Sequence, residues 1–200
     1  MKEATRLYLV RHGQVDGYER FPIYGHTDVA LTEVGMLHFQ QLADRLRFTK
    51  IQAIYSSDLQ RSAVGARIIA QNHDVPVRAC SELRELHFGD WEGLGMQDVR
   101  ERFPALLQDR MRDPVSLRAP GDGETIGELS QRVMDCFRRI LKNHEGRDFL
   151  IVGHGAVNRV ILCDALGLPL QNMFRLHQDY GCLNIVDFFS DSTVVRLING

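Results

Sequence analysis

The sequence lacks the hydrophobic run of about 20 residues that a transmembrane helix needs. Its first segment, MKEATRLYLVRHG, has only a few apolar residues before two basic ones, so it fits neither a signal peptide nor a membrane anchor. An excess of charge is also missing: the net charge is -2 and the pI is near 6.4. We therefore expect a soluble protein without membrane or nucleic-acid partners, in which a local cluster supplies any affinity for anions.

Cysteine is scarce, and its spacing excludes several kinds of site. The four cysteines form no CxxC pair, and most lie in apolar runs, as buried thiols do. They are Cys80, Cys136, Cys163 and Cys182. This pattern indicates free thiols and a cytoplasmic location. Because HExxH, HxxEH and CxxC spacings are all missing, we expect neither a metal nor another cofactor.

The pattern of the remaining sequence predicts a single α/β domain over residues 1–200. The 200 residues are 44% hydrophobic and 25% charged, which suits one compact domain with a core. Short apolar runs predict strands over residues 7–10, 51–55, 75–79, 149–152, 182–189 and 193–198. Amphipathic stretches predict helices after Thr32, after Asp58, after a capping box at Thr125 and Glu128, and over residues 156–166. Strands that alternate with helices are typical of α/β folds.

Two segments between these elements lack such regularity. Residues 82–95 are irregular and contain several glycines. Residues 96–118 predict short helices that Pro104 and Pro114 interrupt. We expect this second segment to form a lid or an excursion from the sheet.

Basic side chains follow three of the predicted strands. Arg11 and His12 end the first strand. Arg61 lies in the first turn of the helix after the second strand, and His154 with Gly155 follows a later one. In open α/β sheets, ligands bind at the carboxyl ends of the strands, where helix N-termini point into the crevice. We expect these side chains to gather around one tetrahedral dianion.

This set of side chains suits attack on a phosphate ester. The planar guanidinium groups of Arg11 and Arg61 match phosphate oxygens and keep their charge. His12, as a neutral imidazole with one ring nitrogen held, can attack phosphorus. A cationic His154 would stabilise the charge that develops on the equatorial oxygens, and the Gly155 amide would add a donor.

The leaving alkoxide also needs a proton, and the irregular segment supplies the candidates. A carboxyl group with a raised pKa is required for this role. Glu85 is the first choice, whereas Glu82, Asp90 and Glu92 are alternatives that otherwise serve as surface charges. The remaining histidines are interpreted as structural or exposed, and His87 is the one expected to line the pocket.

Four motifs, taken together and in this order, resemble the histidine phosphatase superfamily, the phosphoglycerate mutase-like clan. They are LVRHGQ at 9–14, SSDLQRSA at 56–63, ELRELHFGDWEG at 82–93 and IVGHGAV at 151–157. The resemblance spans nearly the whole chain. It implies a three-layer αβα sandwich around a mostly parallel sheet, and catalysis without a metal.

The resemblance also implies a role for each matched position. His12 is then the nucleophile and Glu85 the proton donor, and the phosphate pocket consists of Arg11, Arg61 and His154. The substrate-binding residues that we expect are Arg11, Gln14, Tyr24, Gly25, Arg61 and Gly155. One position departs from the family pattern, because Tyr18 stands where many members carry an asparagine that contacts phosphate.

Within the family, the resemblance favours hydrolysis over phosphoryl transfer to a second substrate. Mutases carry a longer insertion after the proton-donor motif and a C-terminal tail, whereas this chain reads GDWEG and ends at Gly200. Residues 82–93 and the run FRLHQDYGCLNIVDF are most similar to α-ribazole 5'-phosphate phosphatases of cobalamin biosynthesis. We therefore expect a phosphomonoester hydrolase that forms a phosphohistidine, with α-ribazole 5'-phosphate as the first candidate substrate.

Other functions stay open at this point. They are a phosphoserine or sugar-phosphate phosphatase, a cofactor-dependent phosphoglycerate mutase, and a regulatory module that binds phosphate without catalysis. The presence of every catalytic position argues against the regulatory module. The sequence leaves the oligomeric state open, with a homodimer as one alternative.

Overall fold

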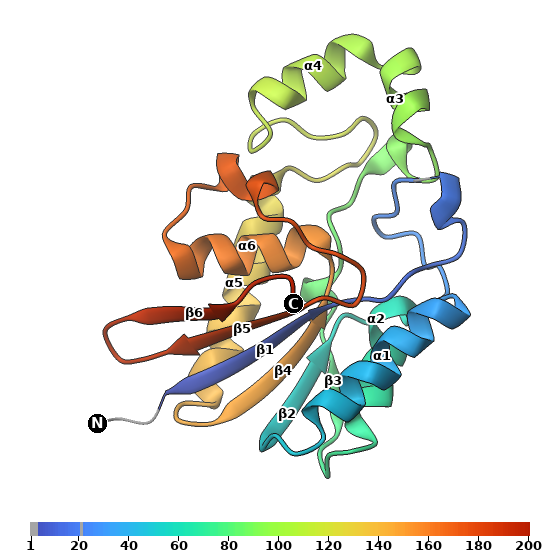
Figure 1. The fold of residues 1–200 in the computed structure, drawn as a ribbon. Helices are drawn as coiled ribbons and strands as arrows, with labels where there is room; N and C mark the ends of the chain where they lie inside the picture. Colours follow the sequence, from blue (N-terminus) through green and yellow to red (C-terminus); the bar gives the residue numbers. More distant parts are fainter. Residues whose placement is uncertain (1–3, 21) are drawn as a thin grey trace.

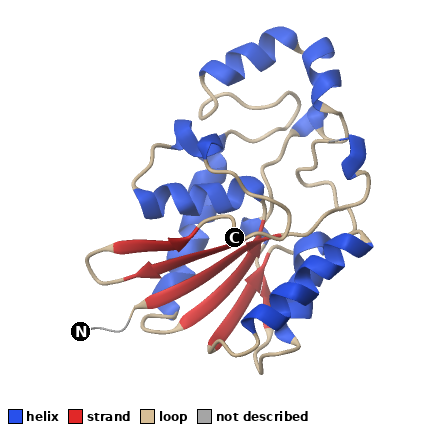
Figure 2. Cartoon of the chain, in the orientation of Figure 1, coloured by secondary structure: helices blue, strands red, loops and turns tan. Residues whose placement is uncertain are grey.

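A six-stranded sheet with helices on both faces forms the centre of the structure (Figures 1 and 2). The computed structural model describes residues 4–20 and 22–200. The strand order is β3-β2-β4-β1-β5-β6. The first four of these strands run parallel, whereas β5 and β6 are antiparallel to their neighbours. The mostly parallel αβα architecture that the motifs implied is confirmed.

The predicted strands and helices occur, with their ends shifted by a few residues at most. The strands span Thr5–Arg11 (β1), Ile51–Ser56 (β2), Val77–Ala79 (β3), Asp148–Gly153 (β4), Leu183–Phe188 (β5) and Thr193–Leu197 (β6). The α-helices span Glu33–Leu46 (α1), Gln60–Ala70 (α2), Met96–Arg102 (α3), Pro104–Arg112 (α4), Ile126–Asn143 (α5) and Gly155–Leu166 (α6). Short 3-10 helices cover Tyr18–Arg20 (η1), Ser81–Leu83 (η2), Gly89–Trp91 (η3) and Leu170–Arg175 (η4).

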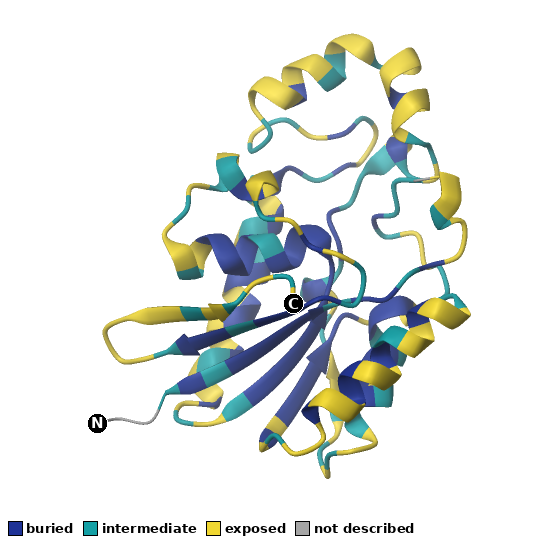
Figure 3. Cartoon of the chain, in the orientation of Figure 1, coloured by how far each residue is buried: buried dark blue, intermediate teal, exposed yellow. Residues whose placement is uncertain are grey.

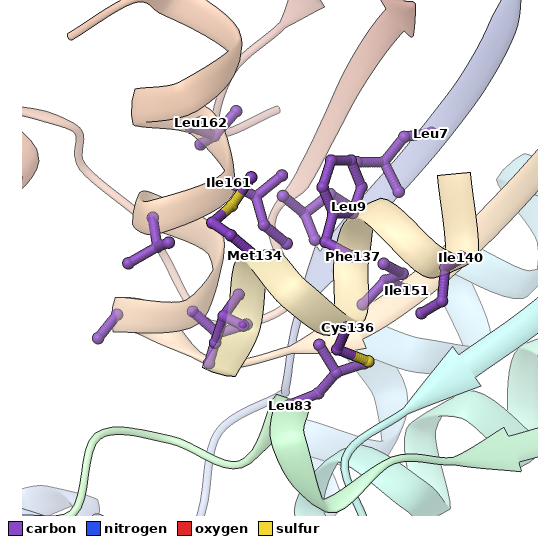
Figure 4. Close-up of a cluster of buried hydrophobic side chains, with 14 of the residues drawn as sticks. Leu7, Leu9, Leu83, Met134, Cys136, Phe137, Ile140, Ile151, Ile161 and Leu162 are labelled. Atoms are coloured by element: carbon purple, nitrogen blue, oxygen red, sulfur yellow. The ribbon is translucent and has the colours of Figure 1, made fainter. Parts of the chain in front are cut away.

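The alternation of side chains along the central strands divides the core into two layers. Leu7 and Leu9 of β1 point to the face that α5 and α6 cover, where they pack near Phe137 (Figure 4). Tyr8 and Val10 point to the opposite face, which α1 and α2 cover. Because both faces of β1 and β4 are buried, the middle residues of these two strands are apolar (Figure 3). This burial holds the carboxyl edge of the sheet in place.

Side-chain caps fix where two of the helices begin. The Thr32 hydroxyl accepts a hydrogen bond from the Gly35 amide at the start of α1. At α5, the Thr125 hydroxyl and the Glu128 carboxylate each accept from the backbone amide of the other residue, so the predicted capping box is confirmed.

The predicted cap of α2 is wrong. Asp58 does not cap this helix, because Leu59 occupies the N-cap position and makes no side-chain bond. The Asp58 carboxylate instead accepts from two guanidinium nitrogens of Arg84, at 2.7 and 2.5 Å. This bidentate pair, with a residue distant in the sequence, determines the orientation of the Asp58 carboxylate.

Residues 96–118 extend beyond the carboxyl edge of the sheet and carry α3 and α4. Helices α3 and α4 stand apart from the sheet and are largely exposed (Figures 1 and 3). The two ends of the excursion meet at its base, where the Asp90 amide donates to the Pro120 carbonyl at 3.0 Å. Nearby, the Glu124 amide donates to the His87 carbonyl at 2.8 Å. We call this base the neck of the excursion.

The helices and the cysteines of the described residues bear on the expectations about membranes and disulfides. None of their helices has the length and apolar character needed to span a bilayer. All four cysteines are free thiols; Cys80 is half-buried and the other three are buried.

Candidate active site

Two histidines lie side by side at the carboxyl edge of the sheet because β1 and β4 pair in parallel register. Arg11 ends β1 directly opposite Gly153, which ends β4. The next residues along the two strands are His12 and His154, and their ring centroids are 5.1 Å apart. Both side chains are buried. The strand pairing therefore places two imidazoles from distant parts of the chain in one site.

The environment of His12 selects one protonation state. Its Nδ1 lies 2.8 Å from the Gly13 carbonyl oxygen, which can only accept, so Nδ1 carries the hydrogen and Nε2 has a free lone pair. Burial, reinforced by the positive charges of Arg11 and Arg61, lowers the pKa of His12 well below its ordinary value. The imidazole is therefore neutral near pH 7, and Nε2 is available as a nucleophile.

His154 is held by two serine hydroxyls. Its Nε2 lies 2.7 Å from Ser57 Oγ and 3.2 Å from Ser62 Oγ. Burial lowers the pKa of His154 well below its ordinary value, and the nearby charge of Arg61 lowers it further. The free imidazole is therefore neutral near pH 7, and its cationic role beside a developing negative charge stays a prediction. A phosphate dianion beside it would favour the protonated form, because an opposite charge raises a histidine pKa.

Acidification is expected to destabilise the folded protein through these two histidines. In the unfolded chain each imidazole takes up a proton near pH 6.5, whereas the folded pKa of each is well below that value. The unfolded state therefore binds more protons as the pH falls, and the free energy of unfolding drops by up to about 1.4 kcal/mol per pH unit for each histidine. Urea unfolding between about pH 7.5 and about pH 5.5 measures this slope.

Two variants separate this effect from general acid sensitivity. His154→Gln removes one of the buried titrating groups, so its slope should be shallower than that of the wild type. His177→Gln is the matched control, because His177 is exposed and pairs with Asp179 at the surface. Equal slopes in His154→Gln and the wild type would contradict the prediction.

Backbone carbonyl oxygens anchor Arg61 and Arg11 close to His12. Arg61, in the first turn of α2, donates from Nη1 to Thr27 O at 2.8 Å and from Nη2 to Gly25 O at 2.6 Å. Arg11 donates from Nη1 to Gln178 O at 2.5 Å. These bonds leave the Nε atom of each arginine buried without a partner among the described residues.

Glu85 lies at the N-terminus of α6, next to the histidine pair. Its carboxylate accepts from the Leu86 amide at 2.8 Å and from the Ala156 amide at 3.2 and 3.3 Å. The alternative acids are used elsewhere. Glu82 forms an ion pair with Arg139, and Asp90 lies at the neck of the excursion. The structure thus favours Glu85 by position, and its role as proton donor stays a prediction.

Glu92, the remaining alternative, fixes the loop that orients Arg61. Its carboxylate accepts from the His26 and Thr27 amides, both at 2.7 Å, and from the Thr27 hydroxyl. Thr27 is one of the two residues whose carbonyls hold Arg61. Those hydrogen bonds lower the pKa of Glu92 although burial opposes them, so the side chain is an anion that organises the backbone.

The other expected substrate-binding residues have partners within the protein. Gln14 Oε1 accepts from the Thr32 hydroxyl, and the Tyr24 hydroxyl donates to Asp16 O. The Gly25 carbonyl accepts from Arg61. Gly155 begins α6, where helical amides point toward the site. Their contacts with a substrate stay predictions.

Tyr180 is a site residue that the sequence did not single out. Its ring stacks on the Arg11 guanidinium, with 4.3 Å between Cζ and the ring centroid, and its centroid is 5.5 Å from that of His12. It follows the irregular segment after η4, where no periodicity marks a functional position. Tyr18, which replaces the family asparagine, has no contact of this kind: its amide donates to Val15 O at the start of η1.

His87 lies against His26, and its lining of the substrate pocket stays a prediction. Its ring packs against His26, 4.6 Å between centroids, and its Nδ1 lies 3.1 Å from Asp122 O. The described residues also contain no group of three or more His, Cys, Asp and Glu side chains placed to bind a metal ion.

Comparison with known proteins explains this arrangement. The family model described as "Histidine phosphatase superfamily (branch 1)" matches residues 7–200. The chain belongs to the histidine phosphatase superfamily. The motifs led to the same family, and that prediction is confirmed.

Curated relatives of this histidine phosphatase differ in length and in name. An adenosylcobalamin/alpha-ribazole phosphatase of Escherichia coli is 28% identical over 97% of the chain and 95% of its own length. A metal-independent phosphoserine phosphatase of Arabidopsis thaliana is 34% identical over 80% of the chain and 68% of its own length. A bifunctional protein of Mycobacterium tuberculosis is 35% identical over 98% of the chain, which spans only 54% of that protein.

Solved structures show the same fold. A putative alpha-ribazole-5'-P phosphatase of Escherichia coli superposes with a TM-score of 0.91 at 26% identity, covering 99% of this chain and 97% of that one. The YhfR protein of Bacillus stearothermophilus gives a TM-score of 0.89 at 30% identity, covering 97% and 96% of the two chains.

Proposed function

We propose that this protein hydrolyses phosphate monoesters through a covalent phosphohistidine on His12. One observation carries the proposal: three buried nitrogens around His12 have no hydrogen-bond partner among the described residues. They are Arg11 Nε, Arg61 Nε and His154 Nδ1. The two arginine nitrogens are donors, and buried donors without partners are costly, so this cluster beside a free imidazole nitrogen supports an anionic ligand.

The reaction would proceed in two displacements. The His12 Nε2 lone pair forms a bond to phosphorus while the bond from phosphorus to the ester oxygen breaks, and Glu85 gives its proton to the departing alcohol. Glu85, now a carboxylate, takes a proton from water as that water attacks the phosphohistidine. Phosphate leaves, and His12 and Glu85 return to their starting states. Arg11 and Arg61 stabilise the transferring group throughout.

The names of the relatives suggest two classes of alcohol in the candidate substrates. Several are named for α-ribazole phosphate, and α-ribazole 5'-phosphate is our first candidate substrate. One is named for phosphoserine, which makes phosphoserine the second candidate. Sugar phosphates are a third. We further propose a cytoplasmic location, because the four thiols are free, and a contribution of the excursion to substrate choice.

A substrate panel with purified protein tests the proposal. Steady release of phosphate from at least one ester is expected, both with EDTA present and without a bisphosphate primer. Loss of activity on chelation would contradict catalysis without a metal. Dependence on a bisphosphate primer, with little net release of phosphate, would instead indicate a mutase.

Tyr180→Ala is expected to raise KM for phosphate esters by about fivefold to tenfold, because stacking on Arg11 is worth about 1 kcal/mol. The ring also limits how far the guanidinium can turn away from the site. Tyr180→Phe keeps the ring and should recover most of the loss, whereas a loss in Tyr180→Phe as large as that in Tyr180→Ala would assign the effect to the hydroxyl. Steady-state kinetics on the three proteins measure this.

A further inference from the structure

A third guanidinium group lies beside the proposed proton donor. Arg159 is in the second turn of α6, and its Nη1 lies 3.0 Å from the point where a Cβ on Gly155 would stand. Glu85 Oε2 lies 3.5 Å from the same point, and Arg11 Nε lies 3.6 Å from it. These three groups converge on the space over Gly155 because that residue has no side chain.

Two contacts hold the Arg159 guanidinium in place and leave its outer nitrogens available. Nε donates to Leu176 O at 2.7 Å, which fixes the plane of the group. Its Cζ lies 5.8 Å from the centroid of Phe174, on η4. Within residues 4–20 and 22–200, neither Nη atom of Arg159 donates a hydrogen bond. A purely structural role would need only the Nε bond.

The electrostatic surroundings also point to a ligand. Burial lowers the pKa of Arg159, and the charge of Arg11 lowers it further, although the side chain stays charged at neutral pH. Two guanidinium groups of like charge are held near each other, with the Glu85 carboxyl group beside them. An oxygen-rich group over Gly155 would relieve the repulsion and accept from the Nη atoms.

The proposed reaction indicates which part of a substrate reaches Arg159. The phosphoryl group lies against His12, Arg11 and Arg61, and Glu85 meets the ester oxygen. The atoms of the alcohol just beyond that oxygen then lie next to Glu85, on the side where Arg159 stands. Arg159 is therefore placed to reach an oxygen of the leaving alcohol close to the ester oxygen.

We propose that Arg159 is a specificity-determining residue that donates hydrogen bonds to an oxygen of the leaving alcohol, close to the ester oxygen. The inference rests on the proposed function and names its substrate class. The class comprises phosphate esters of small, oxygen-rich alcohols, in which a carboxylate, a hydroxyl or a ring oxygen lies near the scissile bond. Plain alkyl and aryl phosphates lack this contact.

Matched substrate pairs test the proposal directly. Phosphoserine and O-phosphoethanolamine differ only by a carboxylate, and ribose 5-phosphate and n-pentyl phosphate differ by the oxygens of the sugar. Arg159→Met should lower kcat/KM for the oxygen-bearing member of at least one pair by about 10-fold to 100-fold, mainly through KM, and for its partner by less than about threefold. The pair that responds tells whether a carboxylate or a sugar is recognised.

Control variants and the wild type keep the test decisive. Arg159→Lys keeps the charge and should recover part of the preference. Arg175→Met, at an exposed arginine of the same region, should leave the ratio within each pair unchanged. Equal losses for both members of each pair, or a wild type that prefers neither oxygen-bearing member, would overturn the proposal. A wild type that hydrolyses no ester and forms no phosphohistidine would instead refute the proposed function itself.

Discussion

His12→Ala should lower the rate of phosphate release by at least about 10⁴-fold, because loss of a covalent nucleophile removes the whole reaction path. The fold should persist, since the His12 side chain makes one hydrogen bond within the described residues, to the Gly13 carbonyl, and its loss leaves no charge behind. Colorimetric phosphate release from p-nitrophenyl phosphate measures the rate. Trapping with labelled substrate should give an acid-labile phosphoenzyme in the wild type and none in the variant.

The matched control is His177→Ala, because the His177 side chain lies at the surface and pairs with Asp179. Its activity should stay near that of the wild type. Retention of more than about one-hundredth of the activity by His12→Ala would be too much for the loss of a nucleophile and would move the covalent step to another residue.

Glu85→Gln should slow esters with poor leaving groups far more than activated aryl esters. An alkoxide needs a proton as it departs, whereas p-nitrophenolate leaves without one, and general acid catalysis is worth about 10²-fold to 10⁴-fold. Glutamine fills nearly the same space and keeps an oxygen that can accept from the Leu86 and Ala156 amides. The rate constant for phosphorylation of the enzyme should fall by at least about 100-fold with an alkyl ester and by less than about tenfold with p-nitrophenyl phosphate.

Single-turnover kinetics with the two ester types separates this step from hydrolysis of the phosphohistidine. Glu82→Gln is the control, because its carboxylate pairs with Arg139 on the exposed side of the same segment. If Glu85→Gln slows both esters equally, the proton comes from another group.

The elements of the fold were predictable where the signal was local. The capping box at Thr125 and Glu128 lies within four residues of sequence, so α5 could be placed from the sequence alone. Asp58 shows the limit of such reasoning. Aspartate often caps helices, but the Asp58 carboxylate pairs with Arg84, which is distant in the sequence.

The topology of the fold predicted which histidines meet in the candidate site, but not the protonation state or the further neighbours of these residues. Because parallel strands end at one edge, His12 and His154 could be expected to meet, and the pairing of β1 with β4 brings them together. The protonation state of His154 depends on how many charges surround it after folding, which no motif encodes. Tyr180 comes from an irregular segment, so only the folded chain shows that its ring covers Arg11.

The neck of the excursion has a consequence for how this protein and its relatives diverge. The two ends of the excursion are joined by backbone hydrogen bonds between Asp90 and Pro120 and between Glu124 and His87. A loop whose ends already meet behaves as an exchangeable module, since a replacement of another length joins the same two attachment points. The strands and the residues at their ends then keep their geometry. The sequence and length of the excursion can therefore change in evolution while the catalytic residues at the carboxyl edge of the sheet stay the same.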